Sequence, residues 1–192
     1  MTEEVASVGT LWPTLMSGEF RLHYVEAGGL RTRCLETGSG DEALILLHGS
    51  GGHLETYTRN FFALGEQYRV YAIDMIGHGF TDKPDHNYEI SHYVKHLADF
   101  MDAVGLDAAH ISGESLGGWA AAQFAIDHPD RLLKLVLNTA GGLTANEEVM
   151  GRIRDLSLKA VAEASHETVR KRLEWLMHDP AIVTDDLTES RF

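Results

Sequence analysis

The sequence predicts an α/β protein with a mostly parallel, doubly wound sheet. Short apolar runs recur along the chain and end at a polar residue or at glycines, and helix-forming segments separate these runs. Because strands of a parallel sheet carry helices on both faces, they are typically continuous apolar runs rather than alternating ones. We predict four buried strands of this kind, at 43–47, 69–73, 108–112 and 132–137.

An antiparallel hairpin is predicted before the first of these strands. Phe20, Leu22 and Tyr24 alternate with polar residues, and a second alternating segment covers 30–35. Gly28-Gly29 lies between the two segments, as expected for a tight two-residue turn.

Helices are expected between the strands. The segment from Leu116 to Asp127 is apolar nearly all round, which predicts a buried helix, and His128-Pro129 ends it. The other two core helices are predicted at about 54–66 and 90–104.

The composition changes after Gly142 to charged, helix-forming sequence. We therefore predict residues 1–142 as the amino-terminal part of a core and residues 143–192 as an incomplete helical lid. No further buried strand follows Leu137, so the final strands of the sheet are expected to be missing. The strand 132–137 should then expose its edge.

The composition favours a small-molecule partner. The 192 residues are 44% hydrophobic and carry a formal net charge of −13, which leaves no basic surface for nucleic acid or an anionic membrane. Cys34 is the only cysteine, and the acidic start lacks the features of a signal peptide. We expect a cytoplasmic protein with no membrane span, cofactor or metal, and leave a homo-oligomer open.

The segment Gly113-Glu114-Ser115-Leu116-Gly117 carries the strongest chemical signal. This G-x-S-x-G stands between a predicted strand and a predicted helix, where a strained turn would expose the Ser115 hydroxyl at the carboxyl end of the sheet. The amino end of the following helix favours a developing negative charge. We predict Ser115 as a catalytic nucleophile; an ordinary Gly-Ser turn is the alternative.

A glycine-rich loop, His48-Gly49-Ser50-Gly51-Gly52, follows the first predicted parallel strand. Glycines let backbone N–H groups face a substrate oxygen, so the N–H groups of Ser50 and Leu116 are predicted to form an oxyanion hole, with Gly49 and Gly51 lining the substrate site. The alternatives are an anion-binding nest and a plain loop. A phosphate loop is disfavoured because neither G-x-x-x-x-G-K-[ST] nor G-x-G-x-x-G is present here.

The segment Asp74-Met75-Ile76-Gly77-His78-Gly79-Phe80-Thr81-Asp82-Lys83-Pro84 resembles the loop after the fourth strand of α/β-hydrolases. The stretch from about 20 to 142 resembles that superfamily, which implies the α/β-hydrolase fold. Within it the chain is most similar to the meta-cleavage product hydrolases, which split carbon–carbon bonds in ring-opened aromatic compounds. His48-Gly49-Ser50 matches their oxyanion loop.

The resemblance also implies a substrate-binding role for Arg191. The lid of meta-cleavage product hydrolases commonly carries an arginine that binds the substrate carboxylate, and Arg191 resembles it; a solvated or snorkelling arginine is the alternative. Glu114 stands where these hydrolases often have asparagine. If it lines the substrate site, its carboxylate would repel an acidic substrate; otherwise it would join a hydrogen-bonded network.

The acid and base of a catalytic triad are not evident. In α/β-hydrolases they follow the serine, on loops after later strands. We therefore expect a fragment that lacks the triad acid and histidine, which would lie beyond Phe192, and a serine without its base is a poor nucleophile. We interpret the residues of suitable type after Ser115 as surface residues: Asp179, Asp185, Asp186, His166 and His178.

His92 and His96 are four residues apart on one predicted helix. No third ligand or H-E-x-x-H glutamate accompanies them, so a solvated helix face is predicted rather than a metal site. His110 lies within a predicted strand and is interpreted as a core residue. His53 and His78 are interpreted as residues that line the pocket, and Asp74 as a residue that anchors the adjacent turn.

We predict a serine hydrolase that cleaves an ester or a carbon–carbon bond next to a ketone, because attack on either carbonyl generates an oxyanion. Serine at position 115 argues against haloalkane dehalogenase and epoxide hydrolase chemistry, which in the resembling families needs a carboxylate nucleophile. The second hypothesis is a catalytically inactive ligand-binding protein that uses the same pocket and lid.

Overall fold

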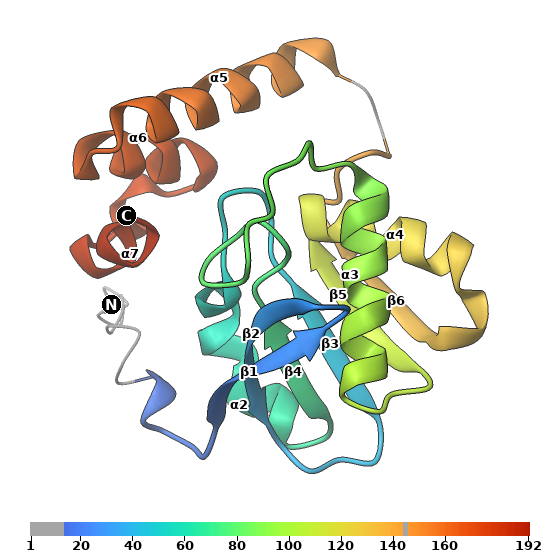
Figure 1. The fold of residues 1–192 in the computed structure, drawn as a ribbon. Helices are drawn as coiled ribbons and strands as arrows, with labels where there is room; N and C mark the ends of the chain where they lie inside the picture. Colours follow the sequence, from blue (N-terminus) through green and yellow to red (C-terminus); the bar gives the residue numbers. More distant parts are fainter. Residues whose placement is uncertain (1–13, 144–145) are drawn as a thin grey trace. The chain divides into compact units, whose positions relative to one another are not determined.

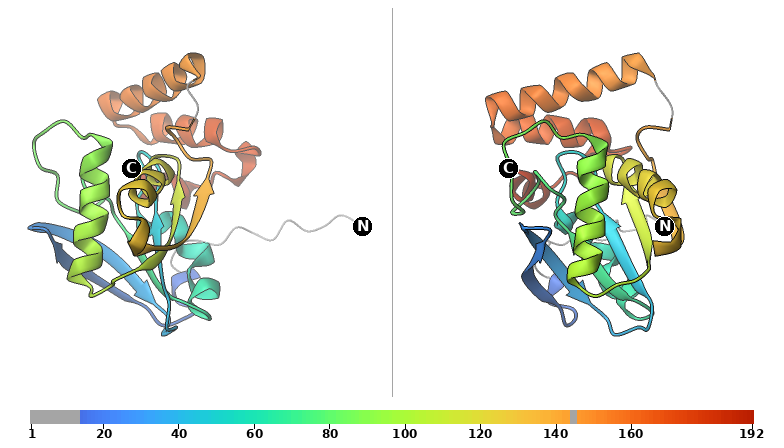
Figure 2. Two further views of the ribbon diagram at one scale, coloured as in Figure 1. Left: turned by 90° about the vertical axis from the view of Figure 1, so that its right-hand side faces the viewer. Right: turned by 45° about the vertical axis from the view of Figure 1, so that its right-hand side comes forward.

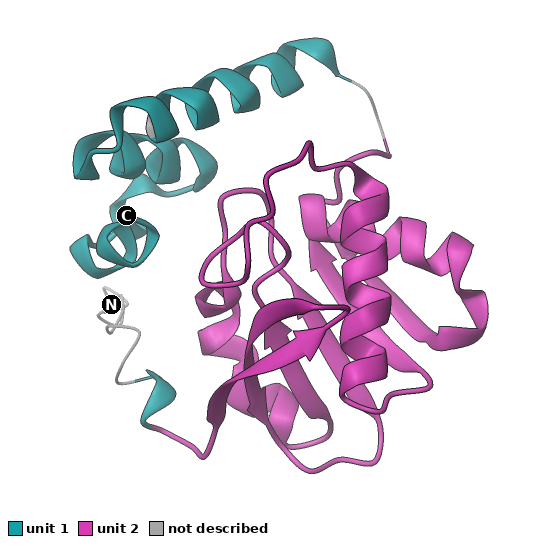
Figure 3. Ribbon diagram, viewed as in Figure 1, with its two compact units in different colours: residues 1–16, 145–192 teal, residues 17–144 magenta. Residues whose placement is uncertain are grey.

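The computed structural model describes residues 14–143 and 146–192, and the chain divides into two compact units (Figures 1 and 3). One unit is Ser17–Thr144, and the other comprises the described residues of Met1–Met16 and Ala145–Phe192. The first unit contains a six-stranded sheet in the order β1-β2-β4-β3-β5-β6.

The sheet begins with the predicted hairpin. β1 (Arg21–Ala27) and β2 (Leu30–Thr37) pair antiparallel. Gly28 and Gly29 between them have φ values of 59° and 85°. A two-residue turn with positive φ at both positions matches the twist of its strands, which explains the glycine pair.

The remaining strands are mostly parallel. β3 (Ala43–Leu47) pairs in parallel with β4 (Arg69–Ile73) on one side and with β5 (Ala109–Glu114) on the other. β5 pairs in parallel with β6 (Leu132–Asn138), whereas β2 and β4 are antiparallel. The predicted α/β class is confirmed. Because the chain leaves β3 toward β4 and later returns to β5, the carboxyl ends of β3 and β5 form a topological switch point, where open α/β sheets bind ligands.

Helices cover both faces of this sheet (Figure 2). α3 and α4 pack against each other and against strands, whereas α2 contacts β2 and β4. The helical segments of this unit are η1 (Leu54–Tyr57), α2 (Thr58–Gly65), α3 (Ile90–Ala103), α4 (Leu116–Asp127) and η2 (Pro129–Arg131).

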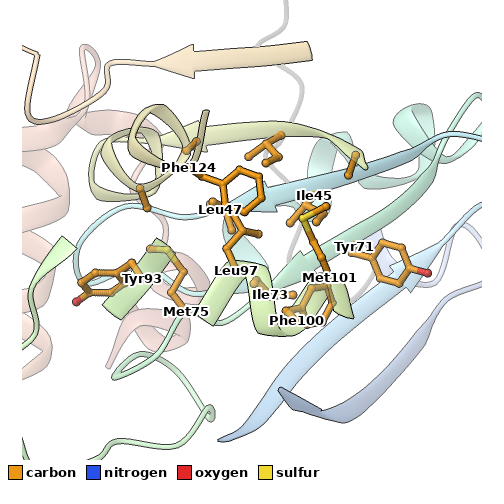
Figure 4. Close-up of a cluster of buried hydrophobic side chains, with 14 of the residues drawn as sticks. Ile45, Leu47, Tyr71, Ile73, Met75, Tyr93, Leu97, Phe100, Met101 and Phe124 are labelled. Atoms are coloured by element: carbon orange, nitrogen blue, oxygen red, sulfur yellow. The ribbon is translucent and has the colours of Figure 1, made fainter. Parts of the chain in front are cut away.

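The main core lies between the sheet and helices α3 and α4 (Figure 4). Ile45 and Leu47 of β3 join Phe100 of α3 and Phe124 of α4 in one buried cluster. The intervening Leu46 is only 2% exposed, and alternate strand residues point to opposite faces. β3 is therefore buried on both faces, as its continuous apolar run predicts.

The second unit is helical. α5 (Glu147–Glu163), α6 (His166–Leu176), η3 (Pro180–Ile182) and α7 (Asp185–Arg191) follow one another, and α6 packs against α5, η3 and α7. Helices are thus present where the lid is predicted, and its function as a lid stays a prediction. None of the described helices is long and apolar enough to cross a membrane.

Two predictions about burial are wrong. β6 is not buried: Leu133, Val136 and Leu137 are 46%, 50% and 37% exposed. Among the described strands β6 pairs with β5 alone, so it is an edge strand, which agrees with the expected exposure of the 132–137 edge. Nor is α4 buried all round, since Trp119 and Ile126 are 40% and 72% exposed.

His96 is a buried structural residue, which corrects the predicted solvated helix face. It is 2% exposed, its Nδ1 accepts the N–H of Ile76 (3.1 Å), and its Nε2 lies 2.7 Å from the hydroxyl of Thr32. With Nδ1 as an acceptor, Nε2 is the donor of a neutral ring. Burial disfavours the charged form and lowers the pKa of His96 to about 4.

We expect the free energy of unfolding to decrease as the pH falls from about 6.5, where an unfolded histidine takes up its proton, toward the His96 pKa of about 4. In this interval the unfolded state binds more protons, so linkage predicts a loss of up to ~3 kcal/mol. Urea unfolding between pH 4 and 7 measures it. His96→Gln should flatten this part of the pH dependence, and His92→Gln should keep it. An unchanged slope in His96→Gln would contradict the assignment.

Candidate active site

Ser115 occupies a strained turn between β5 and α4. Its φ of 50° and ψ of −110° lie in a region that residues with a Cβ rarely adopt. Backbone hydrogen bonds hold this conformation: the Ser115 N–H donates to the carbonyl of Asn138 (3.1 Å), and its carbonyl accepts from Trp119 (3.0 Å) and Gly141 (2.9 Å). The sharp strand-turn-helix expected from G-x-S-x-G is therefore present.

The glycines around Ser115 are required by close packing. An ideal Cβ on Gly113 would lie 2.3 Å from the carbonyl oxygen of Gly117, and one on Gly117 would lie 2.3 Å from that of Leu47. An ideal Cβ on Gly118 would lie 2.7 Å from the Cβ of Ala140. Each distance is below the 3.0 Å that real Cβ atoms respect. The glycine pattern is thus imposed by the approach of α4 to β5 and β3.

The glycine-rich loop lies beside this turn. Leu47 is the parallel partner of Gly113, so the residues after β3 and β5 leave the sheet next to each other. An ideal Cβ on Gly49 would lie 2.3 Å from a carboxylate oxygen of Glu114. The structure therefore brings the Gly49–Ser50 segment close to the Glu114–Leu116 segment, and the Glu114 carboxylate faces the loop.

His48 anchors the start of this loop. It is fully buried, its Nε2 accepts the N–H of Met75 (3.0 Å), and its Nδ1 donates to the carbonyl of Gly49 (2.9 Å). The N–H of Gly52 then closes a turn onto the same carbonyl (2.9 Å), and Gly51 has a φ of 70°. The loop is therefore a preformed turn.

The two predicted oxyanion donors come from the two adjoining segments. The N–H of Leu116 is the first of α4, and the first N–H groups of a helix have no intrahelical acceptor and carry partial positive charge. Ser50 follows Gly49 in the adjacent loop. Two N–H groups from neighbouring loops are the arrangement that stabilises a tetrahedral oxyanion, and this role for Ser50 and Leu116 stays a prediction.

Asp74 ties down the loop after β4, as predicted. It is fully buried. Its Oδ1 accepts the N–H of Leu54 (2.7 Å), and its Oδ2 accepts the N–H of Phe80 (2.9 Å) and a guanidinium N–H of Arg33 (3.2 Å). One carboxylate thus connects β2 with the loops that follow β3 and β4.

No histidine or carboxylate among residues 14–143 and 146–192 is hydrogen-bonded to the hydroxyl of Ser115. That the acid and the histidine lie beyond Phe192 stays a prediction. Three of the residues of suitable type have partners within the second unit: His166 with Glu189 (2.6 Å), Asp179 with the N–H of Ala181 (2.9 Å), and Asp185 with Arg170.

The remaining predicted residues lie in both units. His110 is buried and bonded to Glu42 (3.0 Å), which confirms a core position. The rings of His78 and His48 are tilted by 56° with centroids 5.0 Å apart, and burial lowers the pKa of His78. Arg191 is the last residue of α7, and its substrate-binding role stays a prediction.

Two charged residues near the site were missed from the sequence. Arg33 is 6% exposed, and it contacts both Asp74 and Glu55. Neither Arg33 nor Glu55 belongs to a recognisable motif, and they are 22 positions apart. The only sequence signal is that a charged residue, Arg33, stands within a strand, directly before the buried Cys34.

The sheet order, the strained serine turn and the adjoining glycine loop define the class of α/β-hydrolase-fold proteins. Residues 42–177 match the family described as alpha/beta hydrolase fold, and the chain belongs to this family.

Its relatives include meta-cleavage product hydrolases. The chain is 34% identical over 174 residues to a 2-hydroxy-6-oxo-2,4-heptadienoate hydrolase of Pseudomonas putida, covering 88% of this chain and 60% of the relative. A crystal structure of the meta-cleavage product hydrolase from Pseudomonas fluorescens IP01 is similar with a TM-score of 0.75 and 34% identity, over 88% of this chain and 61% of that one.

A bacterial membrane phospholipase A is similar in structure as well. Its TM-score is 0.76 at 28% identity, over 90% of this chain and 56% of that one. The chain thus spans about 60% of the length of the hydrolases that it matches.

Proposed function

We propose that the protein hydrolyses a carbon–carbon bond next to a ketone in a ring-opened dienoate, with Ser115 as the nucleophile. The observation that carries this proposal is the strained conformation of Ser115, φ 50° and ψ −110°, at the amino end of α4. Strain of this kind persists only where the surroundings enforce it, and it is concentrated at functional sites.

The proposed reaction begins with attack of the Ser115 Oγ on the ketone carbon. The N–H groups of Ser50 and Leu116 stabilise the resulting oxyanion. Collapse of this intermediate breaks the adjacent carbon–carbon bond, the departing carbon takes up a proton, and water releases the acid from the acyl-enzyme. The alternative course is direct attack by a water activated near Ser115, which uses the same oxyanion donors.

A fast reaction needs a general base for the Ser115 proton. Among the described residues none is hydrogen-bonded to this hydroxyl. An oxyanion hole and substrate binding alone leave roughly 10³- to 10⁴-fold acceleration over water. That none of the described residues is bound to the Ser115 hydroxyl is the observation that favours the second candidate, a catalytically inactive ligand-binding protein.

The substrate class is proposed from the relatives. The Pseudomonas putida relative is named for 2-hydroxy-6-oxo-2,4-heptadienoate, which combines a carboxylate, a hydroxyl and a ketone. We propose that Arg191 binds the carboxylate and that residues 143–192 act as a lid over a small-molecule site. The ester alternative is supported by the similarity to a phospholipase A. A cytoplasmic location and a homo-oligomer remain predictions.

Hydrolysis of two substrates tests this proposal. We expect cleavage of 2-hydroxy-6-oxo-2,4-heptadienoate with a higher kcat/KM than p-nitrophenyl acetate, and a lower kcat for Ser115→Ala, because only the serine pathway is lost. Ser112→Ala, which removes a hydroxyl of β5 three residues before Ser115, is the matched control and should retain activity.

Each other outcome selects an alternative. Preferential cleavage of the ester would replace the carbon–carbon proposal with esterase activity. Equal rates for the wild type and Ser115→Ala would reject the nucleophile. Binding of the dienoate without cleavage would favour the ligand-binding protein.

A further inference from the structure

A second set of polar groups lies at the carboxyl edge of the sheet, outside the proposed serine chemistry. We call it the His53 cluster; its members are His53, Glu55, Arg33 and Asp74. Arg33 contacts Asp74 (3.2 Å) and Glu55, and Glu55 in turn accepts a hydrogen bond from Nδ1 of His53 (2.5 Å). These side chains are between 0% and 22% exposed.

The cluster fixes the hydrogen bonding of the His53 ring. Burial opposes ionisation of Glu55, but the hydrogen bond from His53 and the charges of His53 and Arg33 outweigh it and lower the pKa of Glu55 to about 2. Glu55 is therefore a carboxylate near neutral pH and can only accept. The charge of His53 acts at the low pH where Glu55 titrates. When the ring is neutral, the hydrogen bond to Glu55 keeps the hydrogen on Nδ1, so Nε2 presents its lone pair.

Nε2 of His53 is buried and has no hydrogen-bond partner within the described residues. A buried polar atom without a partner is unfavourable, so native proteins retain few of them, and those retained call for an explanation such as an absent water or ligand. The Glu55 carboxylate is bound to His53 and Arg33, and the Asp74 carboxylate is bound to Arg33 and to backbone N–H groups. Nε2 of His53 is therefore the atom of this cluster that a ligand would satisfy.

His53 directly follows the glycine-rich loop that adjoins the serine turn. The Gly52 N–H to Gly49 carbonyl bond closes a turn, so Gly52 lies within about 7 Å of Gly49 and His53 about 4 Å farther along the chain. Gly49 itself contacts Glu114, the neighbour of Ser115. On the other side, the N–H of Leu54 is bound to Asp74 at the end of β4. His53 thus stands at the edge of the sheet where Ser115 also emerges.

We propose that His53 is a substrate-positioning residue whose Nε2 accepts a hydrogen bond from a hydroxyl group of the substrate, with Glu55 holding the ring in the required tautomer. The ligand class is a hydroxylated, unsaturated keto acid, and this assignment rests on the proposed function. Arg33 and Asp74 act through Glu55 and through the loop after β3, without contact to the ligand.

The affinities of two ligands, compared with and without a substitution at His53, test this inference independently of catalysis. Binding is measured in the Ser115→Ala chain, which prevents turnover, for 2-hydroxy-6-oxo-2,4-heptadienoate and for 6-oxo-2,4-heptadienoate, which lacks the hydroxyl. We expect the hydroxylated ligand to bind about tenfold more tightly, because one hydrogen bond to a buried partner is lost with the hydroxyl. His53→Asn keeps a donor at the position of Nδ1 but removes Nε2, and it should abolish this preference.

Two controls separate ligand binding from structural support. His86→Asn changes an exposed histidine and should keep the tenfold preference. The ¹⁵N NMR signal of Nε2 in His53 should shift when the hydroxylated ligand binds and stay in place with the other ligand. A purely structural His53 would weaken both ligands equally without such a shift.

Equal affinity for the two ligands, no binding of either, or a preference retained in His53→Asn would overturn the inference. The reactivity of Ser115 is measured separately in the wild-type chain. It then shows whether the assignment of Ser115 as the nucleophile still holds.

Discussion

Gly117→Ala is expected to destabilise the protein by about 3 kcal/mol or more, because overpacking a core with one extra carbon already costs roughly 1–3 kcal/mol where side chains can adjust. Here the new Cβ would lie 2.3 Å from the carbonyl oxygen of Leu47 and 2.6 Å from that of His48, and both atoms are backbone. The central strand β3 would have to move away from α4.

The same displacement should impair the site. Gly117 is two residues after Ser115, and Leu47 and His48 lead into the glycine-rich loop. Separating these segments moves the N–H of Leu116 away from that of Ser50, so we expect Gly117→Ala to lose Ser115 reactivity even in the fraction that remains folded. Urea unfolding and the rate of Ser115 modification measure the two effects.

Gly151→Ala is the matched control. Gly151 lies in α5, and an ideal Cβ there has nothing within 4 Å. Because this half-buried helix position has open space for a Cβ, alanine there should stabilise by about 0.5–1 kcal/mol. A Gly117→Ala protein with the stability and reactivity of the wild type would show that the close approach of α4 to β3 is not required.

The strands could be predicted because their signal is local. The apolar run of β3 ends at His48, the run of β4 ends at Asp74, and the glycine pair marks the hairpin. The predicted strands therefore agree with the observed ones within one or two residues. The predicted burial of β6 was wrong. Whether a strand is buried depends on its neighbours in the sheet, and a local sequence pattern does not contain these neighbours.

The serine turn could be predicted for a related reason. G-x-S-x-G specifies backbone geometry over five consecutive residues, and packing around Gly113 and Gly117 requires their glycines. The buried role of His96 depends on Thr32, 64 positions away, and the Arg33 to Asp74 contact spans 41 positions. The first pairing arises when α3 packs against β2, and the second arises when the sheet brings β2 beside β4, so no sequence window contains them.

The second large effect is expected at Ser115 itself. A serine activated by its surroundings reacts with a fluorophosphonate through attack of Oγ on phosphorus and loss of fluoride, and the N–H groups that stabilise an oxyanion also stabilise this transition state. The conformation of Ser115 at the amino end of α4 favours this reaction. Serines such as Ser190, which donates to the carbonyl of Leu187 on α7, have no such environment.

Intact-mass measurement after fluorophosphonate treatment tests this claim most directly. The account predicts one adduct per chain, mapped to Ser115 by peptide sequencing and absent from Ser115→Ala. An unmodified protein, or an adduct that persists in Ser115→Ala, would contradict the assignment of Ser115 as the nucleophile.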